Sequence, residues 1–198
     1  PVFDCRAAYP RYVETKDNNP HGPDYLIDDI DTYIYDWQPS EPMGYIDQVA
    51  HTYAYTLGTY ALQNEKQVSI GESTCGAKIF TKPLAAGGKA LLHMNMLTEL
   101  GLERCDTARC AVLTMGDLSM QYGFYGEAST GDEHTARAEA GEALLVADPT
   151  EVWMFHILPD DTGTQAVWVA QRIPDDELAM CANSFVIGEI DVSDSDNF

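Results

Sequence analysis

The sequence predicts an α+β domain in which antiparallel strands flank one pair of helices. Two observations predict it. Apolar alternation typical of strands occurs in both the first and the last third of the core, and helical spacing is confined to residues 90–123. An order of strands, helices and strands favours helices packed on one face of antiparallel sheets. The chain has 198 residues, 45% of them apolar, which suits one domain with a sizeable core.

Residues 1–43 are predicted to form an irregular excursion ahead of a core at residues 44–191. The excursion is rich in proline and contains the acidic run at residues 28–31, Asp-Asp-Ile-Asp. This run lacks the alternating ligands and the mid-loop glycine of an EF-hand. We therefore interpret it as surface chain rather than as a calcium site.

The first part of the core is predicted to consist of short strands joined by turns. Residues 44–64 alternate between larger and smaller side chains, and Gly58 should bend the strand there. Residues 63–66 are typical of a hairpin turn, and residues 67–74 should form the next strand.

Two helices follow, at about residues 90–104 and from Asp106 or Thr107 to Tyr122. Either Asp106 or Thr107 can cap the second helix, and Gly123 suits the position after its end. The second helix carries an apolar stripe at helical spacing: Ala108, Ala111, Val112, Met115, Leu118, Ser119 and Tyr122. The two helices should form a hairpin packed on the sheet. Residues 124–140 are rich in glycine, alanine, threonine and glutamate and are predicted to form a mobile loop.

The last part of the core is predicted to be a strand at residues 142–148 and a β-hairpin at residues 152–158 and 166–170. Side chains of 152–158 are apolar on both faces, which indicates a central strand pair with both faces covered. His156, in the middle of this strand, is interpreted as a core histidine rather than a base. Arg172 and Asn183 stand where the apolar pattern ends, at a sheet rim where polar residues often carry chemistry.

Composition excludes several classes of function. A net charge of −21 disfavours nucleic acid and anionic membranes, and the sequence contains no apolar run long enough for a transmembrane helix. The five cysteines form neither a disulfide scaffold nor a zinc ribbon. No paired-histidine metal motif, phosphate-binding glycine loop or serine nucleophile motif is present, so no metal or cofactor is expected.

Four short motifs, in order along the chain, resemble the PepD-type dipeptidases, which are cysteine hydrolases of the N-terminal-nucleophile class. The motifs are NEKQVSIGEST at residues 64–74, TARCAVLTMGDLSMQYG at 107–123, EALLVADPTEVW at 142–153, and VWVAQRIPDD at 167–176 with AN at 182–183. Each motif alone is weak, but the four together are specific.

The resemblance implies a four-layer αββα sandwich and hydrolysis of short peptides by an N-terminal Cys, whose own α-amine is the base. Asn183 is then the candidate donor to the oxyanion, or alternatively a strand cap. Arg172, Glu72 and Thr74 are candidate substrate-binding residues. Arg172 can equally form a buried ion pair with a nearby aspartate, and Glu72 and Thr74 can simply end a strand.

Two departures from the family pattern stand out. Gln67 occupies a turn position where the family has glycine, so a different turn is expected. The nucleophilic Cys has no counterpart, because Cys5 lies in a context that does not match. The chain alone is therefore expected to be an inactive fragment of a hydrolase domain, with unpaired edges that favour association, including homo-oligomers. Two alternatives remain: a non-catalytic regulatory or interaction protein like the secernins, and an amidase acting on acyl amides.

Overall fold

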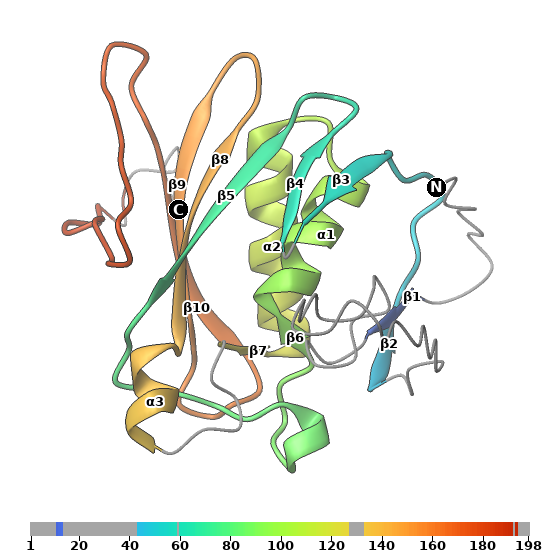
Figure 1. Cartoon of the computed structure of the whole chain (residues 1–198), viewed down its shortest axis with the longest axis vertical. Helices are drawn as coiled ribbons and strands as arrows, with labels where there is room; N and C mark the ends of the chain where they lie inside the picture. The colour runs from blue at the N-terminus through green and yellow to red at the C-terminus, as the bar shows by residue number, and fades with distance from the viewer. Residues whose placement is uncertain (1–10, 14–42, 59, 127–132, 192, 194–198) are drawn as a thin grey trace, which may run out of the picture.

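One antiparallel sheet of six strands organises the chain (Figure 1). The computed structural model describes residues 11–13, 43–58, 60–126, 133–191 and 193, and all structural statements concern these residues. The strand order is β10-β9-β8-β5-β4-β3. The strands are β3 (Tyr55–Leu57), β4 (Ala61–Asn64), β5 (Ser69–Cys75), β8 (Gly141–Ala147), β9 (Val152–Pro159) and β10 (Ala166–Arg172). Together with the helices, this confirms the α+β class.

Most of the expected excursion lies outside the described residues, including the acidic run at 28–31. Within it, β1 (Arg11–Val13) pairs in antiparallel fashion with β2 (Gly44–Ile46). The division into an excursion and a core therefore stays a prediction.

The predicted hairpin of β9 and β10 is present, with Ala166 opposite Pro159 and Arg172 opposite Trp153. Both faces of β9 are covered, because Trp153 is buried on one side and Met154 on the other. The expectation of a central pair is wrong for β10, however, which lies at the edge of the sheet.

The turn between β4 and β5 keeps a conformation that favours glycine. Gln67 has φ 67°, in the left-handed region that favours glycine, and the expected difference from the family's turn stays a prediction. The side chain of Asn64 stabilises the turn, because its Oδ1 accepts the backbone N–H groups of Lys66 and Val68, each at 3.0 Å. The same side chain donates to the carbonyls of Leu102 and Cys105, which ties the turn to the helix pair.

The helices are α1 (Met94–Arg104) and α2 (Ala108–Tyr122). Thr107 caps α2 as predicted, accepting the N–H of Cys110 at 3.2 Å, and Gly123 ends it at φ 76°. The first helix begins later than predicted because Leu92–His93 (β6) pairs in parallel with Phe124–Tyr125 (β7). The expected loop at 124–140 is also wrong in part, since it contains β7 and α3 (Glu133–Ala138).

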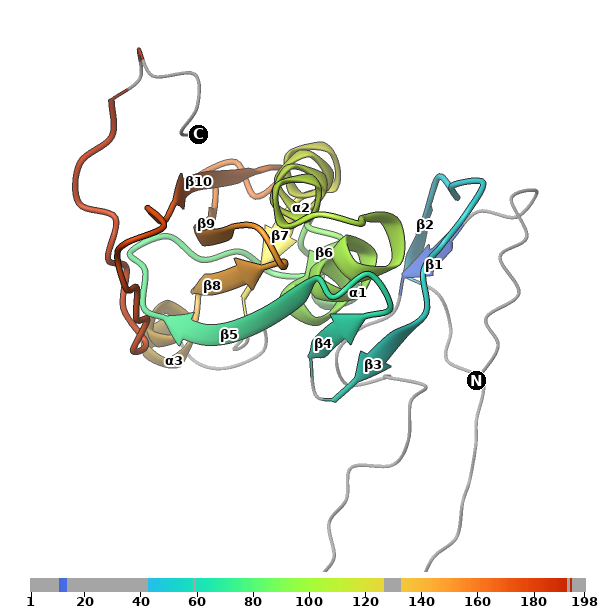
Figure 2. The same ribbon diagram turned by 90° about the horizontal axis from the view of Figure 1, so that it is seen from above.

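The core lies between the sheet and the α1–α2 pair, which cover one face (Figure 2). The stripe of α2 is turned toward it, and Met115 and Val112 are fully buried. Gly116 lets α2 approach β10 closely, because a Cβ at this position would lie 2.3 Å from Cε2 of the Trp168 ring. Large side chains fill the space between the two layers: Leu97, Leu100, Leu102, Leu144, Trp153 and Phe155.

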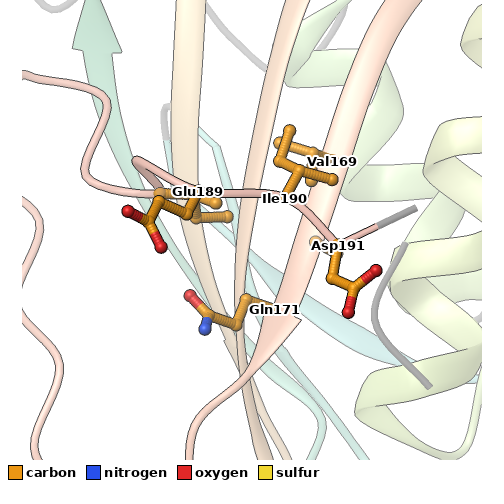
Figure 3. Close-up of a pocket in the computed structure, with 7 residues that line it drawn as sticks. Val169, Gln171, Glu189, Ile190 and Asp191 are labelled. Atoms are coloured by element: carbon orange, nitrogen blue, oxygen red, sulfur yellow. The ribbon is translucent and has the colours of Figure 1, made fainter. Parts of the chain in front are cut away.

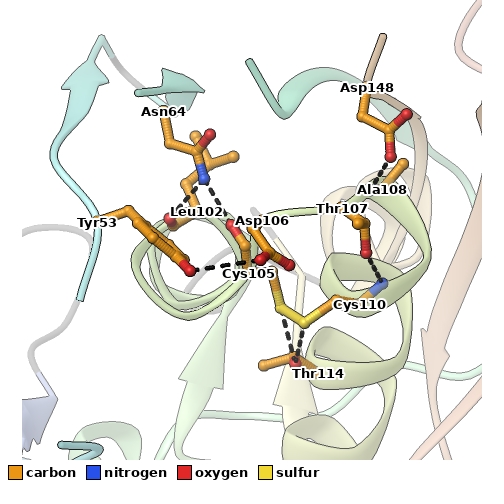
Figure 4. The surroundings of a disulfide bond; sticks show 10 residues. All are labelled: Tyr53, Asn64, Leu102, Cys105, Asp106, Thr107, Ala108, Cys110, Thr114 and Asp148. Carbon is orange, nitrogen blue, oxygen red and sulfur yellow. Dashed lines mark hydrogen bonds between the residues drawn. A yellow bond between two sulfur atoms is a disulfide. The ribbon is translucent and has the colours of Figure 1, made fainter. Parts of the chain in front are cut away.

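A disulfide between Cys105 and Cys110 joins the end of α1 to the first turn of α2 (Figure 4). The two Cα atoms are 5.4 Å apart, so the bridge spans the helix connection although a helix begins between the cysteines. Asp148, after β8, accepts the N–H of Ala108 at 2.7 Å and so fixes the same connection to the sheet. The pairing was not anticipated from the spacing of the cysteines.

The opposite face of the sheet carries the chain that follows β10. In Figure 2 this segment, residues 173–191, runs on the side away from α1 and α2. Among the described residues no second large sheet lies on this face, and the other sheets are the pairs β1–β2 and β6–β7. The αββα sandwich therefore stays a prediction.

Candidate functional site

Three of the four candidate residues meet near the end of β5. The side-chain amide of Asn183 donates to the backbone carbonyl of Thr74 at 3.0 Å, across 109 positions of sequence. The hydroxyl of Thr74 donates in turn to Oε1 of Glu72, also at 3.0 Å. Asn183 has φ 52°, a left-handed conformation that asparagine tolerates better than most residues. The structure thus joins Asn183, Thr74 and Glu72 into one short hydrogen-bonded chain.

Thr74 and Asn183 border an open hollow of about 500 Å³, and Glu72 adjoins it through its hydrogen bond to Thr74. Thr74 and Asn183 form one wall, and Glu139, just after α3, adds a carboxylate that the motifs did not single out. The other lining residues are Tyr60, Gly76 and Ala138. The pairing of β4 with β5 consists of Gln63 opposite Ser69, at the start of β5, so the far end of β5 diverges from its neighbour. The volume and the open rim suit a small ligand.

Arg172 does not belong to this group. Its row across the sheet runs through Trp153 and Val146 to Ile70, four positions along β5 from Thr74. That places it roughly 13 Å along the strands and roughly 14 Å across them from Thr74, at ordinary strand spacings. Its Nη2 lies 2.6 Å from Oδ1 of Asp175 and its Nε lies 3.5 Å from Oε2 of Glu151.

The ion pairs of Arg172 match the structural alternative considered from the sequence, although they are at the surface rather than buried. Hydrogen bonding to Asp175 raises the pKa of Arg172 above its ordinary value. The guanidinium that would bind a substrate carboxylate is therefore already paired with Asp175 and Glu151.

Cys75 lies next to Thr74 but does not suit the role of a nucleophile. It is buried, its thiol contacts the carbonyl of Ser73 at 3.4 Å, and burial raises the pKa of the thiol to about 12. Cys181 and the acidic groups Glu142 and Glu72 act in the same direction. Because the thiolate is the reactive form, Cys75 stays protonated and inert at neutral pH.

A second hollow of about 420 Å³ lies between β10 and the segment at residues 187–191 (Figure 3). Its apolar lining is Val169, Ala170, Ile187 and Ile190, and its polar lining is Gln171, Glu189 and Asp191. None of the candidate residues lines it. Within the described part of the chain, no group of three or more His, Cys, Asp or Glu side chains is arranged to hold a metal ion. No described helix is long and apolar enough to cross a membrane.

Comparison with known proteins decides the family. The model of peptidase family C69 matches residues 39–198, which is most of the chain. The chain belongs to peptidase family C69. The resemblance to PepD-type dipeptidases, drawn from the four motifs, is thereby confirmed.

A probable dipeptidase of Latilactobacillus sakei is 33% identical to this C69 chain over 116 residues. The match covers 59% of the chain and 20% of that protein. The matched part of the C69 chain therefore spans about a fifth of the length of this relative.

Proposed function

We propose that the full-length protein is a cysteine-type dipeptidase. The observation that carries the proposal is the anchored amide of Asn183 beside an open hollow, in a chain of peptidase family C69. The likeness to a probable dipeptidase supports short peptides as substrates. The nucleophile is an N-terminal Cys located outside these 198 residues. In the same proposal, a second antiparallel sheet packs on the side of the sheet away from α1 and α2, which carries residues 173–191, and completes an αββα sandwich.

The reaction follows the chemistry of an N-terminal thiol. The α-amine takes the thiol proton, and the sulfur bonds to the scissile carbonyl carbon, so that its oxygen becomes an oxyanion. The C–N bond then breaks, the leaving amine takes the proton, and a thioester remains. Water attacks the thioester with the α-amine as base, which releases the acid and restores the thiol.

Asn183 stabilises the oxyanion in this proposal. An asparagine amide carries two N–H donors and stays neutral at every relevant pH. One N–H is used on the carbonyl of Thr74, which holds the amide in place. The second N–H is then available to donate to the oxyanion. Because the amide is already held in place, it needs little reorganisation, and such a preorganised donor stabilises the transition state.

Glu72 binds the substrate's α-ammonium group. Its Oε1 accepts the hydroxyl of Thr74, which orients the carboxylate and leaves Oε2 for the ligand. Glu72→Gln should raise KM for dipeptides about tenfold or more, since a hydrogen bond to a charged group contributes about 1.5–3 kcal/mol. Steady-state hydrolysis by the full-length enzyme measures this change. Glu177→Gln, at an exposed position after β10, is the matched control and should leave KM unchanged.

The function is tested with purified full-length protein and three substrate types: a dipeptide, its N-acetylated form and a long-chain acyl amide. A dipeptidase cleaves the dipeptide in preference to the acetylated form and loses activity when the N-terminal Cys is alkylated. Preference for the acyl amide would make the protein an amidase. An N-terminal residue other than Cys, Ser or Thr, with no turnover of any substrate, would favour the non-catalytic interaction role.

Arg172→Ala should leave kcat/KM for dipeptides within about a factor of two, because Arg172 lies far from Thr74 and pairs with Asp175 and Glu151. Loss of these exposed ion pairs should also change the stability of the fold little. Kinetics of the variant beside Glu72→Gln test this placement. A large rise in KM in Arg172→Ala alone would return Arg172 to the substrate site.

A further inference from the structure

The segment that carries Asn183 is fixed to the sheet on both sides of that residue. On one side, the carbonyl of Cys181 accepts the hydroxyl of Ser73 at 3.5 Å. On the other side, the N–H of Val186 points to Nε2 of His156 at 3.4 Å. The position of Asn183 thus depends on side chains of β5 and β9 as well as on its own bond to Thr74.

The two anchoring side chains belong to one row of the sheet. Ser73 is opposite Ala143, and Ala143 is opposite His156, so the three residues present their side chains on the same face. This is the face away from α1 and α2, over which residues 173–191 run. Because the side chain of Ala143, between Ser73 and His156, is small, the segment has room to pack on the sheet there.

Phe185 adds an apolar contact between the two anchors. Its ring lies 5.0 Å from the His156 ring, centre to centre. A Cβ on Gly141 would lie 2.6 Å from Cζ of Phe185, so the ring is seated directly on the glycine backbone. The imidazole of His156 therefore contacts the segment twice, through its ring, tilted by 58° to that of Phe185, and through a nitrogen.

The contact with Val186 defines the protonation state of His156. Because the backbone N–H donates, Nε2 must be an acceptor, which requires a neutral ring with its proton on Nδ1. His156 is buried, and burial lowers the pKa of its imidazole below the ordinary value. The groups on this face that can titrate or carry charge are Cys75 of β5 and, in the segment, Cys181, Glu189 and Asp191. The residues directly opposite or next to His156 on β8 and β10 are Ala143 and Val169, which carry no charge.

We propose that His156 is a positioning residue, whose neutral imidazole holds Val186 and thereby fixes the turn that presents Asn183 at the end of β5. The catalytic consequence rests on the proposed function, in which Asn183 is the oxyanion donor. The contacts of His156 with Val186 and Phe185 do not depend on it. Sequence reasoning assigned His156 to the core alone, since its partner lies 30 positions away in an irregular segment.

The test compares two substitutions in the full-length protein. His156→Phe keeps an aromatic ring but removes the acceptor, whereas His156→Gln places a non-titrating acceptor near the position of Nε2. His156→Phe should lower kcat by about tenfold to a hundredfold with little change in KM, because a small misplacement of a catalytic group can cost about 10²-fold. His156→Gln should restore most of the lost kcat, which a purely space-filling role would not predict.

Hydrogen exchange of residues 181–186 supplies a readout independent of activity. Exchange in this segment should be faster in His156→Phe than in wild type and near normal in His156→Gln, with the β8–β9 peptides as internal controls. Unchanged exchange in His156→Phe would overturn the proposal whatever the activities. If Asn183→Ala keeps full activity while His156→Phe still exposes the segment, the oxyanion role fails and the positioning of the segment stands.

Acid pH gives a second test that needs no disruptive variant. Because the pKa of His156 is lowered in the folded protein, the ring is neutral and the segment is held at every pH above the ordinary histidine pKa of about 6.5. The segment is released as the pH falls through the lower pKa of the folded state. Wild type should therefore lose protection of residues 181–186 on acidification, after correction for intrinsic exchange, whereas His156→Gln should not. The same acid dependence in His156→Gln would contradict the role of His156, and this comparison remains available if His156→Phe does not fold.

Discussion

Replacing Asn183 by alanine in the full-length enzyme is expected to lower kcat for a dipeptide by roughly 10²–10³-fold, the range for loss of one oxyanion donor. The donor acts on charge that develops only in the transition state, so KM should change much less. Steady-state kinetics under saturating and limiting substrate separate the two constants. Asn183→Asp should be at least as damaging, because a carboxylate would face the developing negative charge.

The conformation of Asn183 calls for a second substitution as a control. Alanine adopts the left-handed conformation at φ 52° less readily than asparagine, so Asn183→Ala also destabilises the turn itself. Asn183→Gly removes the amide while tolerating the same φ, and it should lose kcat to the same extent. If the glycine variant keeps full kcat, or if both variants lose activity only in step with stability, Asn183 is a structural cap.

The largest expected effect on stability is that of Met115→Asp in α2, which should reduce the free energy of unfolding by about 3–5 kcal/mol, as for an unpaired buried charge. Met115 is fully buried, and its Cγ would lie 3.3 Å from a Cβ placed on Gly101 of α1. The aspartate would therefore sit in the middle of the contact between the two helices. Thermal melts followed by circular dichroism, together with the soluble yield, measure the change.

Two variants make the Met115 result specific. Met120→Asp changes the same residue type on the same helix, but Met120 is 38% exposed, so the melting temperature should shift little. Met115→Leu keeps volume and polarity and should cost less than about 1.5 kcal/mol. Equal melts for Met115→Asp and Met120→Asp would reject the burial of the α2 stripe.

Local signals in the sequence were sufficient for the elements whose causes are local. The spacing of apolar residues, the cap at Thr107 and the glycine at 123 determined α2, because these interactions span only a few residues. The doubly apolar pattern of residues 152–158 likewise indicated a strand buried on both faces. The motifs in their order were sufficient for the family.

Tertiary structure decided the elements that depend on distant partners. The parallel pair β6–β7 makes α1 begin later than predicted and gives part of the expected loop a regular structure. Local patterns could not predict this pair, because its two strands lie on either side of the α1–α2 hairpin in the sequence. The bond between Cys105 and Cys110 depended on how the helix connection folds back, which five residues of spacing do not specify.

The candidate site shows the same division. The sequence by itself selected Glu72, Thr74 and Asn183 as polar residues at strand ends, but their meeting required residues 74 and 183 to come together across the sheet. The sequence also predicted that Arg172 lies at a rim of the sheet, but it did not specify at which end of the sheet. In an antiparallel sheet, neighbouring strands run in opposite directions and so finish at opposite ends of the sheet. β10 is three strands from β5, so its last residues lie at the end of the sheet away from Thr74. Strand order, which no local pattern encodes, therefore separated Arg172 from Thr74 and brought His156 under the segment that carries Asn183.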